Sequence, residues 1–402
     1  MNRFNPIHFR EQFPALRTIG VYLDNAASAL KPQCVIDAAT QFYSCGMGTV
    51  HRSHFPAAQA LTAEYEQARN KVAHLINAPD ASTIVWTRGT TESINLVARS
   101  WLQPRLRAGD EILVSEAEHH ANLIPWLMLA EHCGSRVVRW PVGRDMLPDM
   151  ALLPNLLSSR TRLMALGQMS NVTGGCPPLA KAIRLAHQAG ARVMIDGAQG
   201  IVHTDTDVQA LDIDFYAFSS HKLYGPMGVG VLYGKSELLE EMPPWQGGGK
   251  MLTRVDFSGF TPQVVPWRFE AGTPNVAGVA GLAVALDWLR GCDREGAQRY
   301  SSGLANLAQK QLASLPGFRS FRSANSCLLS FDIAGLHHQD VVMLLAEKGI
   351  ALRAGQHCAQ PLIKALGVAG TLRASFAPYN TEQDVEKLVS ALHSTVKILT
   401  DK

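Results

Sequence analysis

The chain has 402 residues, of which 47 % are hydrophobic and 18 % are charged. This composition excludes a disordered protein, and the length is sufficient for two domains of unequal size with a large buried core. The 37 Lys and Arg residues nearly balance the 34 Asp and Glu residues, so the net charge is only +3. We therefore expect no nucleic-acid partner and no anionic membrane surface.

The lack of a recognisable targeting signal and the pattern of cysteines predict a cytoplasmic protein. The longest uninterrupted apolar run, residues 276–286, is much shorter than the about twenty residues that cross a membrane. The N-terminus has no apolar segment of the secretory type. Seven cysteines without CxxC spacing argue against a disulfide framework and a zinc ribbon. We expect a cytoplasmic protein without a metal site.

Short β-rich runs alternate with helical ones from about residue 83 to residue 233. The expected strands are residues 82–87, 111–115, 136–140, 162–168, 191–196, 214–219 and 228–234. Between most of them we expect helices, because apolar residues recur at helical spacing, as in residues 91–101. The alternation predicts βαβ units and an α/β fold whose mainly parallel sheet has helices on both faces.

A Gly/Pro-rich region from Pro243 to Pro274 ends this pattern. After it we expect helices and strands of a smaller α+β domain, completed by an N-terminal helix near residues 8–13. The expected helices are residues 276–286, 298–314, 339–348 and 381–399, and the expected strands are residues 327–332 and 350–353. We assign residues 22–282 to the large domain, and residues 1–21 and 283–402 to the small one.

Three motifs follow strands of the expected parallel sheet, at the edge where such sheets bind ligands. Gly89 and two threonines, including Thr91, begin a helix and form either a phosphate seat or a plain N-cap. His119, in a His-His pair, either stacks on a planar cofactor or lies in a solvated loop. Asp196, at the end of an apolar strand, either holds a protonated ring nitrogen or a metal, or caps a helix.

The fourth motif, residues 214–234, is the most specific. It places Lys222 between an aromatic-rich strand and a Gly-Pro turn, where a partly apolar pocket makes the amine nucleophilic. Ser219 and His221 precede it and can hold a phosphate, although a chance surface lysine is the alternative. A phosphate seat, a stacking ring, a carboxylate and an amine together match pyridoxal 5′-phosphate.

A second chemistry is expected in residues 351–361. Cys358 follows His357 and lies near Arg353, and cationic neighbours favour the thiolate form of a cysteine. The alternative is a structural cysteine. Arg373, on an expected strand, suits a substrate carboxylate, although a structural ion pair is its alternative. His337 and His338 begin a helix and receive no chemical role.

These motifs together resemble the cysteine desulfurases, a family with the fold of the class V aminotransferases. The resemblance rests on DNAAS, VHRS, RGTTESIN, EHHAN, DGAQ, SSHKLYGP, EAGTPN and RAGQHCA, and it runs from Asp24 nearly to the C-terminus. The short loop around Cys358 is similar to that of the second-group enzymes related to the SUF and cysteine sulfinate desulfinase systems. Gln356, where many SUF-type members have His, favours the desulfinase type. The resemblance implies fold type I of the pyridoxal-phosphate enzymes, with a seven-stranded sheet.

The resemblance also implies roles for individual residues. Lys222 would bond to the cofactor and move protons, and Cys358 would accept the sulfur. The implied cofactor contacts are His119 on the ring, Asp196 on its nitrogen, Gln199 on its phenolic oxygen, Thr91, Ser219 and His221 on the phosphate, and Thr273 from the other subunit of a homodimer. The implied substrate-binding residues are Asn171, Arg373 and Arg353.

The implied reaction converts L-cysteine to L-alanine and leaves a persulfide on Cys358, from which a protein acceptor takes the sulfur for iron–sulfur clusters or tRNA. L-selenocysteine and L-cysteine sulfinate are further implied substrates. Two alternatives remain open. An aminotransferase or kynureninase-like enzyme would share the Lys222 motifs and leave Cys358 unused. A sulfur carrier or scaffold that kept the fold would contain no cofactor.

Overall fold

A sheet of seven strands forms the larger part of the computed structural model, which describes residues 3–45 and 48–400. Across the sheet the strand order is β2-β8-β7-β6-β5-β3-β4. The bounds are Ile84–Thr87 (β2), Glu111–Ser115 (β3), Arg136–Trp140 (β4), Thr161–Gly167 (β5), Arg192–Asp196 (β6), Phe215–Ser219 (β7) and Gly230–Gly234 (β8). All neighbours are parallel except for β8, which is antiparallel to both β2 and β7. The mainly parallel seven-stranded sheet expected from the sequence is confirmed.

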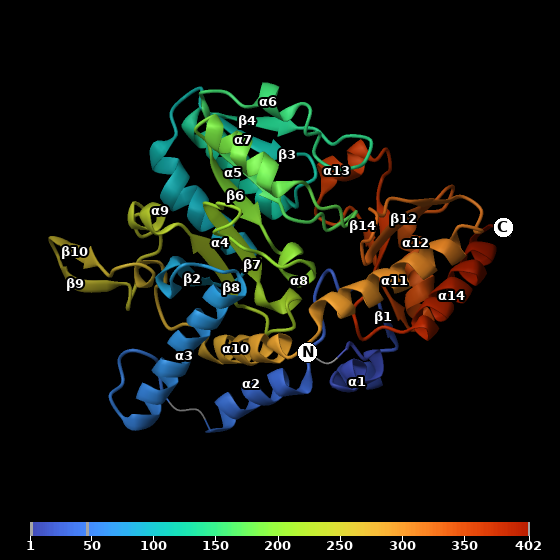
Figure 1. Ribbon diagram of the computed structural model, residues 1–402, viewed down its shortest axis with the longest axis horizontal. Coiled ribbons are helices and arrows are strands. Elements are labelled where there is room, and N and C mark those ends of the chain that lie inside the picture. The colour runs from blue at the N-terminus through green and yellow to red at the C-terminus, as the bar shows by residue number, and fades with distance from the viewer. Residues whose placement is uncertain (1–2, 46–47, 401–402) are drawn as a thin grey trace.

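Helices cover both faces of this sheet, as Figure 1 shows. Alternate residues of one strand enter different cores: Leu113 of β3 packs in one apolar cluster, and Ile112 and Val114 pack in the other. All strands of the sheet except the edge strand β4 are mostly buried, which explains why they read as nearly continuous apolar runs. The helices of this part are α2 (Gln33–Cys45), α3 (Pro56–Leu75), α4 (Thr90–Leu96), α5 (Ile124–Cys133), α6 (Leu153–Leu156), α7 (Leu179–Gln188), α8 (Gly200–His203), α9 (Ser236–Glu240) and α10 (Val276–Arg290).

A smaller body lies beside the first and carries an antiparallel sheet of order β11-β12-β15-β14 (Figure 1). Its strands are β11 (Phe318–Ser320), β12 (Leu328–Ile333), β14 (Arg353–Gly355) and β15 (Thr371–Ser375). Its helices are α11 (Arg294–Leu312), α12 (His338–Glu347), α13 (Gln360–Ala365) and α14 (Glu382–Thr400). The helix that the sequence places at 91–101 begins as α4 and continues as a π-helical segment from Val97 to Leu102.

The N-terminal segment joins the two bodies. Helix α1 (Pro6–Glu11) places Phe9 against Trp288 of α10, with ring centroids 5.3 Å apart. Strand β1 (Val21–Tyr22) pairs in parallel with β13 (Ile350–Ala351), far along the chain. Helix α10 continues to Arg290, and its Leu289 still packs in the core of the large sheet. A domain boundary between residues 282 and 283 would therefore divide this helix.

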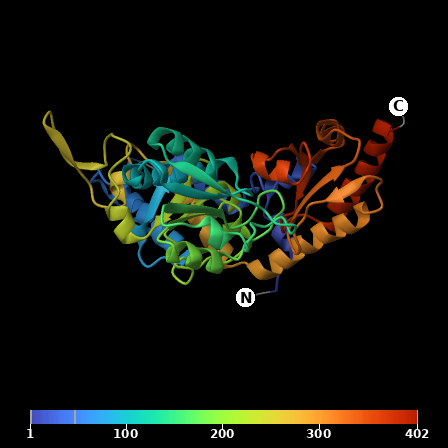
Figure 2. The ribbon, with the colours of Figure 1, turned by 90° about the horizontal axis from the view of Figure 1, so that it is seen from above.

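A hairpin of β9 (Leu252–Asp256) and β10 (Gly259–Pro262) projects from the end of the molecule remote from the small body, as Figures 1 and 2 both show. The sequence analysis had placed only a Gly/Pro-rich interruption there. No helix in the part of the chain that the structure describes is long and apolar enough to cross a membrane.

Candidate active site

A cavity of about 230 Å³ lies between the large sheet and the small body. Its lining includes the ends of β5, β6 and β7 on one side, and residues of the β14–β15 region on the other. Most of the site residues predicted from the sequence line this cavity. They are Thr91, His119, Asn171, Asp196, Gln199, Ser219, His221, Lys222, Arg353 and Arg373. The remaining two, Cys358 and Thr273, are not among the residues that line it.

Lys222 ends a short 3-10 turn that directly follows β7. Burial lowers the pKa of its amine to about 8, although the carboxylate of Asp196 opposes this shift. Among the described residues, no acceptor forms a hydrogen bond with the Lys222 amine. With a pKa of about 8, roughly a tenth of this amine is neutral at pH 7, far more than for an ordinary lysine, and the neutral form is the nucleophile for an aldehyde.

Asp196 ends β6 at the floor of the cavity. Its Oδ1 accepts a hydrogen bond from the backbone N–H of Ala198 at 2.9 Å, and burial raises the pKa of this carboxyl group. Gln199 follows and donates its amide to the carbonyl of Ala26 at 2.7 Å. The buried Asp196 carboxyl is suited to a cationic ring nitrogen, because an opposite charge offsets the cost of its burial.

His119 and His221 are neutral imidazoles on the cavity wall. The Nδ1 atom of His119 accepts a hydrogen bond from the N–H of Ala121 at 3.0 Å, which orients the ring. Burial, followed by the charge of Lys222, lowers the pKa of His119 to about 4. The same two causes lower the pKa of His221 to about 4, and its buried Nδ1 has no partner among the described residues.

The start of α4 forms a cup of donors. Ser219 Oγ accepts a hydrogen bond from the N–H of Thr90 at 2.9 Å and lies 2.8 Å from the Thr90 hydroxyl. Behind them, a Cβ on Gly230 would come within 2.4 Å of Gly89, so only glycine permits this approach. Hydroxyls and free N–H groups at a helix start suit a phosphate. The unpartnered amine, the buried carboxyl, the neutral rings and this cup fit pyridoxal 5′-phosphate.

Two arginines face the cavity from neighbouring strands of the small sheet. Arg353 of β14 and Arg373 of β15 are register partners. The guanidinium of Arg373 forms an ion pair with Asp24 at 3.1 Å and donates to the carbonyl of Asn171 at 2.8 Å. The buried Arg373 Nε has no hydrogen-bond partner within the described part of the chain. Arg373 therefore both forms an ion pair within the protein and lines the cavity. Together, the two neighbouring guanidinium groups favour an anionic ligand.

Cys358 lies on a strained turn beside the cavity. His357 and Cys358 have φ angles of +51° and +54°, a left-handed conformation that costs each non-glycine residue about 1–3 kcal/mol. Two hydrogen bonds hold the turn: Cys358 O accepts from His120 N at 2.6 Å, and His357 O accepts from Asn171 Nδ2 at 2.8 Å. The turn that carries the thiol is therefore attached directly to cavity-wall segments.

The expectation that His357 supplies a positive charge beside Cys358 is wrong. Burial, followed by the charge of Arg373, lowers the pKa of His357 to about 3, so the ring is neutral. Its Nε2 lies 2.9 Å from the hydroxyl of Thr371. The cationic neighbours in this region are Arg353 and Arg373.

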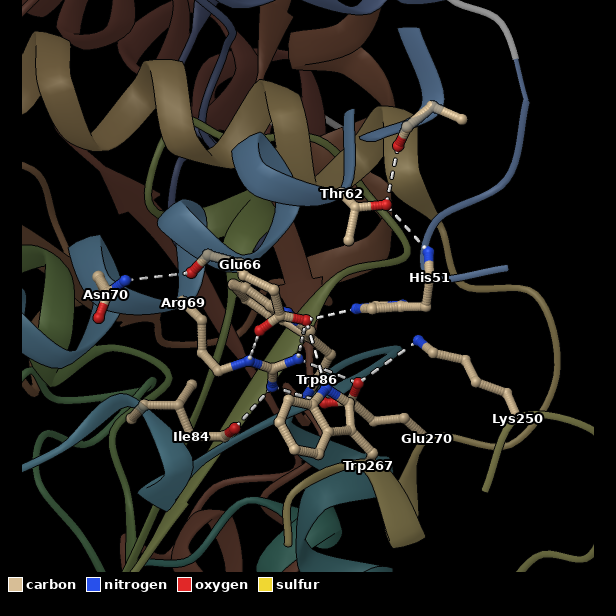
Figure 3. A network of polar contacts seen from close by, with 11 residues as sticks. His51, Thr62, Glu66, Arg69, Asn70, Ile84, Trp86, Lys250, Trp267 and Glu270 are labelled. Atoms are coloured by element: carbon tan, nitrogen blue, oxygen red, sulfur yellow. Dashed lines mark hydrogen bonds and ion pairs between the residues drawn. The ribbon is translucent and has the colours of Figure 1, made fainter. Parts of the chain in front are cut away.

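Thr273 lies in a different surface pocket, which Arg88 and Glu92 also line. Its loop is held by a buried ion network (Figure 3), in which Glu270 accepts from Arg69 Nη1 at 2.6 Å. Arg69 also pairs with Glu66 at 2.9 Å. Thr273 therefore does not line the Lys222 cavity, and the ion network holds its loop in place.

Sequence reasoning missed two polar residues of the site, Glu118 and Asp24. Glu118 lines the cavity with only 3 % of its surface exposed, and Asp24 pairs with Arg373. Glu118 begins the motif EHHAN beside His119, and Asp24 begins the motif DNAAS beside Asn25. These positions within motifs were the available signal that the two residues belong to the site. Among residues 3–45 and 48–400, no group of three or more His, Cys, Asp or Glu side chains could hold a metal ion.

Comparison with known proteins agrees with this geometry. The model of the family "Aminotransferase class-V" matches residues 21–388. The chain is 65 % identical to the cysteine desulfurase CsdA of Escherichia coli over 100 % of both chains, and 50 % identical to a probable cysteine desulfurase of Vibrio cholerae over 97 % of this chain and 98 % of the relative. A crystal structure of E. coli CsdA as an S-sulfonic acid superposes with a TM-score of 0.95 at 64 % identity, covering 99 % of this chain and 100 % of that one.

More distant structures share the fold. A cysteine desulfurase of Thermococcus onnurineus matches with a TM-score of 0.92 at 32 % identity, covering 99 % of each chain. A Lys-to-Ala mutant of C-DES, with glycine covalently linked to its pyridoxal-phosphate cofactor, matches with a TM-score of 0.82 at 26 % identity, covering 95 % of this chain and 98 % of that one. The chain therefore belongs to the class V aminotransferase family of pyridoxal-phosphate enzymes and, within it, to the cysteine desulfurases.

Proposed function

We propose that this protein converts L-cysteine to L-alanine and retains the sulfur as a persulfide on Cys358. The observation that carries the proposal is the strained Cys358 turn, which is hydrogen-bonded to the His119–His120 segment and to Asn171 at the cavity. A strained turn persists where surrounding bonds hold it, and such turns concentrate at functional sites. The high identity to CsdA over the full chain supports the same activity.

The residues of the cavity divide the work of holding the cofactor and moving protons. Lys222 would hold the cofactor aldehyde and carry a proton at Nζ, since its pKa of about 8 allows both uptake and release near neutral pH. Asp196 would bind the ring nitrogen, His119 the ring face and Gln199 the phenolic oxygen, with Thr91, Ser219 and His221 at the phosphate. When bound, pyridoxal 5′-phosphate supplies the electron sink for the carbanion at the substrate α-carbon.

The substrate would be held by its carboxylate. Arg373 offers its unpartnered Nε, and Arg353 adds a second positive charge from the next strand. Asn171 bonds both to Arg373 and to the His357 carbonyl. The thiolate of Cys358 then attacks the substrate sulfur, so that an S–S bond forms as the carbon–sulfur bond breaks. The carbon takes a proton and leaves as L-alanine, and the persulfide sulfur passes to an acceptor protein.

The same residues support proposals for the oligomeric state, the domain bounds and the cellular compartment. We infer a homodimer in which Thr273 completes the phosphate site of the partner, because Thr273 lines a separate surface pocket and not the cavity of its own subunit. We place the cofactor-holding domain at residues 22–282 and the Cys358-bearing domain at residues 1–21 and 283–402, a boundary that falls within α10. All seven cysteines are unpaired, which supports the cytoplasm, where such an enzyme would serve iron–sulfur cluster or tRNA thiolation.

The test is the Cys358→Ala variant, because it separates a sulfur-transfer enzyme from an aminotransferase. The thiol of L-cysteine is a poor leaving group without a thiolate to take the sulfur, whereas selenium and sulfinate depart more readily. We expect L-cysteine turnover to fall on the order of a thousandfold, with much smaller losses for L-selenocysteine and L-cysteine sulfinate. Alanine release without a keto-acid acceptor measures the rates, and mass spectrometry of the wild type should show one extra sulfur on the Cys358 peptide.

An equal fall with all three substrates would show that Cys358 is structural. Cys133→Ala is the matched control, since Cys133 is also partly exposed and neither it nor the residues next to it line the cavity, and it should leave all three rates unchanged.

A further inference from the structure

Glu118 is a buried carboxyl group that the proposed reaction does not use. It directly precedes His119, lines the Lys222 cavity and is only 3 % exposed. A buried carboxyl without compensation is costly, so its partners show what it does. Glu118 Oε1 accepts a hydrogen bond from the backbone N–H of Gly167 at 2.8 Å, and Oε2 accepts from Asn122 Nδ2 at 2.6 Å.

The orientation of the Asn122 amide is fixed independently. Its Oδ1 accepts a hydrogen bond from the indole N–H of Trp126 at 3.2 Å. An amide whose oxygen faces an indole donor must present its NH₂ group to the opposite side, where Glu118 lies. The two donors that reach this side chain, Gly167 N and Asn122 Nδ2, therefore each need an acceptor oxygen at position 118.

The Gly167 contact connects this chain of bonds to Asp196. Gly167 of β5 is the register partner of Asp196 of β6. A Cβ on Gly167 would lie only 3.3 Å from Glu118 Oε2, so the strand end leaves room for the carboxyl group because it is glycine. The loop that carries His119 is thus bonded to the backbone position directly beside Asp196.

We propose that Glu118 is a positioning residue that sets the gap between the His119 ring and the Asp196 carboxyl, in which a planar aromatic cofactor lies. This rests on the proposed function only in that the ring is taken to stack on His119 and to bind Asp196. The loop also bonds to β4 through Glu116 N and Trp140 O, but the Glu118–Gly167 bond is the one that ties it to the strand end beside Asp196. A gap set by side-chain bonds keeps its width before the cofactor arrives, which lowers the cost of ordering the site on binding.

Opposing influences act on the pKa of Glu118. Burial raises it to about 8 and the charge of Asp196 adds to the rise, whereas the bonds from Asn122, Gly167 and Ser115 lower it because they favour the ionised carboxylate with two acceptor oxygens.

The test exchanges the hydrogen-bond pattern, and its double variant keeps the number of acidic residues constant. Glu118→Gln places an NH₂ group opposite the NH₂ group of Asn122, so one bond is replaced by a donor–donor conflict. Adding Asn122→Asp restores an acceptor there, and the second oxygen of the new carboxyl still accepts from Trp126. Glu116→Gln is the matched control, because Glu116 lies two residues away, bonds to Val142 N at 3.2 Å and does not line the cavity.

The dissociation constant of pyridoxal phosphate for each apoprotein, and the visible circular dichroism of the bound cofactor, are the measurements. We expect Glu118→Gln to weaken binding about tenfold and to reduce the dichroic band, and the double variant to return to within about twofold of the wild type. The control should match the wild type. Melting temperatures of the apoproteins separate these effects from loss of folding.

Wild-type affinity in Glu118→Gln, or a double variant as weak as the single one, would overturn the proposal, since the bond pattern would then not set the site. These measurements need no turnover. If the wild type releases no alanine from L-cysteine while the affinity pattern holds, the proposed function fails and the role of Glu118 stands.

Discussion

Burial, more than pairing, determines the protonation of the individual side chains around the cavity. It lowers the pKa of Lys222 to about 8 and that of His119 to about 4, and it raises the pKa of Asp196. Each shift disfavours the charged form of its group. The cavity therefore combines a neutral stacking ring with an amine that can both bond to an aldehyde and carry a proton.

The pKa of Lys222 gives a pH dependence that can be measured on the apoprotein. The neutral amine reacts, so the rate of borohydride-trapped labelling of Lys222 by pyridoxal phosphate should rise about tenfold per pH unit below pH 8 and level off above it. A lysine with its ordinary pKa would continue to gain rate beyond pH 10. Peptide mapping at each pH reads out the label. A Lys222 rate that still climbs between pH 9 and pH 10 would contradict the burial argument.

At the scale of elements, helix α10 supports the turn that follows Lys222. Gly281 of α10 faces Pro226, four residues after Lys222, and a Cβ on Gly281 would come within 2.5 Å of the proline ring. The helix can approach the turn this closely because position 281 has no side chain. The contact links a helix of the large core to the position of the reactive amine.

Two glycine substitutions in neighbouring helices should therefore have opposite effects. Gly281→Ala should lower the free energy of unfolding by about 1–3 kcal/mol through overpacking. Gly303→Ala in α11 meets nothing within 4 Å and should raise it by about 0.5–1 kcal/mol, because alanine favours the helix. Urea unfolding of both variants measures the difference. Equal signs would show that the Gly281–Pro226 approach is not tight.

How far each element could be predicted depends on how local its cause is. The strand ending at Asp196 and the turn carrying Lys222 follow from apolar runs and Gly-Pro chemistry within a few residues, and they were expected. The reversed direction of β8 and the β9–β10 hairpin depend on pairing between strands, which periodicity does not encode. The ion pair of Arg373 with Asp24 and the neutrality of His357 depend on partners and burial from distant segments.

At the scale of the whole molecule, the position of Thr273 gives a test of subunit composition. Mixing Lys222→Ala subunits with Thr273→Ala subunits gives heterodimers in which one site has its own Lys222 and the partner's intact Thr273 loop. If Thr273 acts across the interface, the mixture should recover about one quarter of wild-type activity, since half of the dimers are mixed and each has one complete site. Activity after denaturation and remixing, with sedimentation to confirm dimers, measures this.

No recovery above the average of the two parents would place Thr273 in the site of its own subunit. A monomeric wild type would exclude the shared site altogether.

The pairing of β1 with β13 and of Asp24 with Arg373 also sets an order of events on the ribosome. Asp24 and Arg373 are 349 positions apart, which at about 5–20 residues per second means tens of seconds of synthesis between them. The large sheet is complete at Gly234, so Lys222 can be enclosed on one side while Arg353, the Cys358 turn and Arg373 do not yet exist. Sulfur transfer therefore requires the C-terminal segments to be made and to pack against the N-terminal ones. A truncated product would hold the reactive amine of Lys222 without the thiol of Cys358 that completes the reaction.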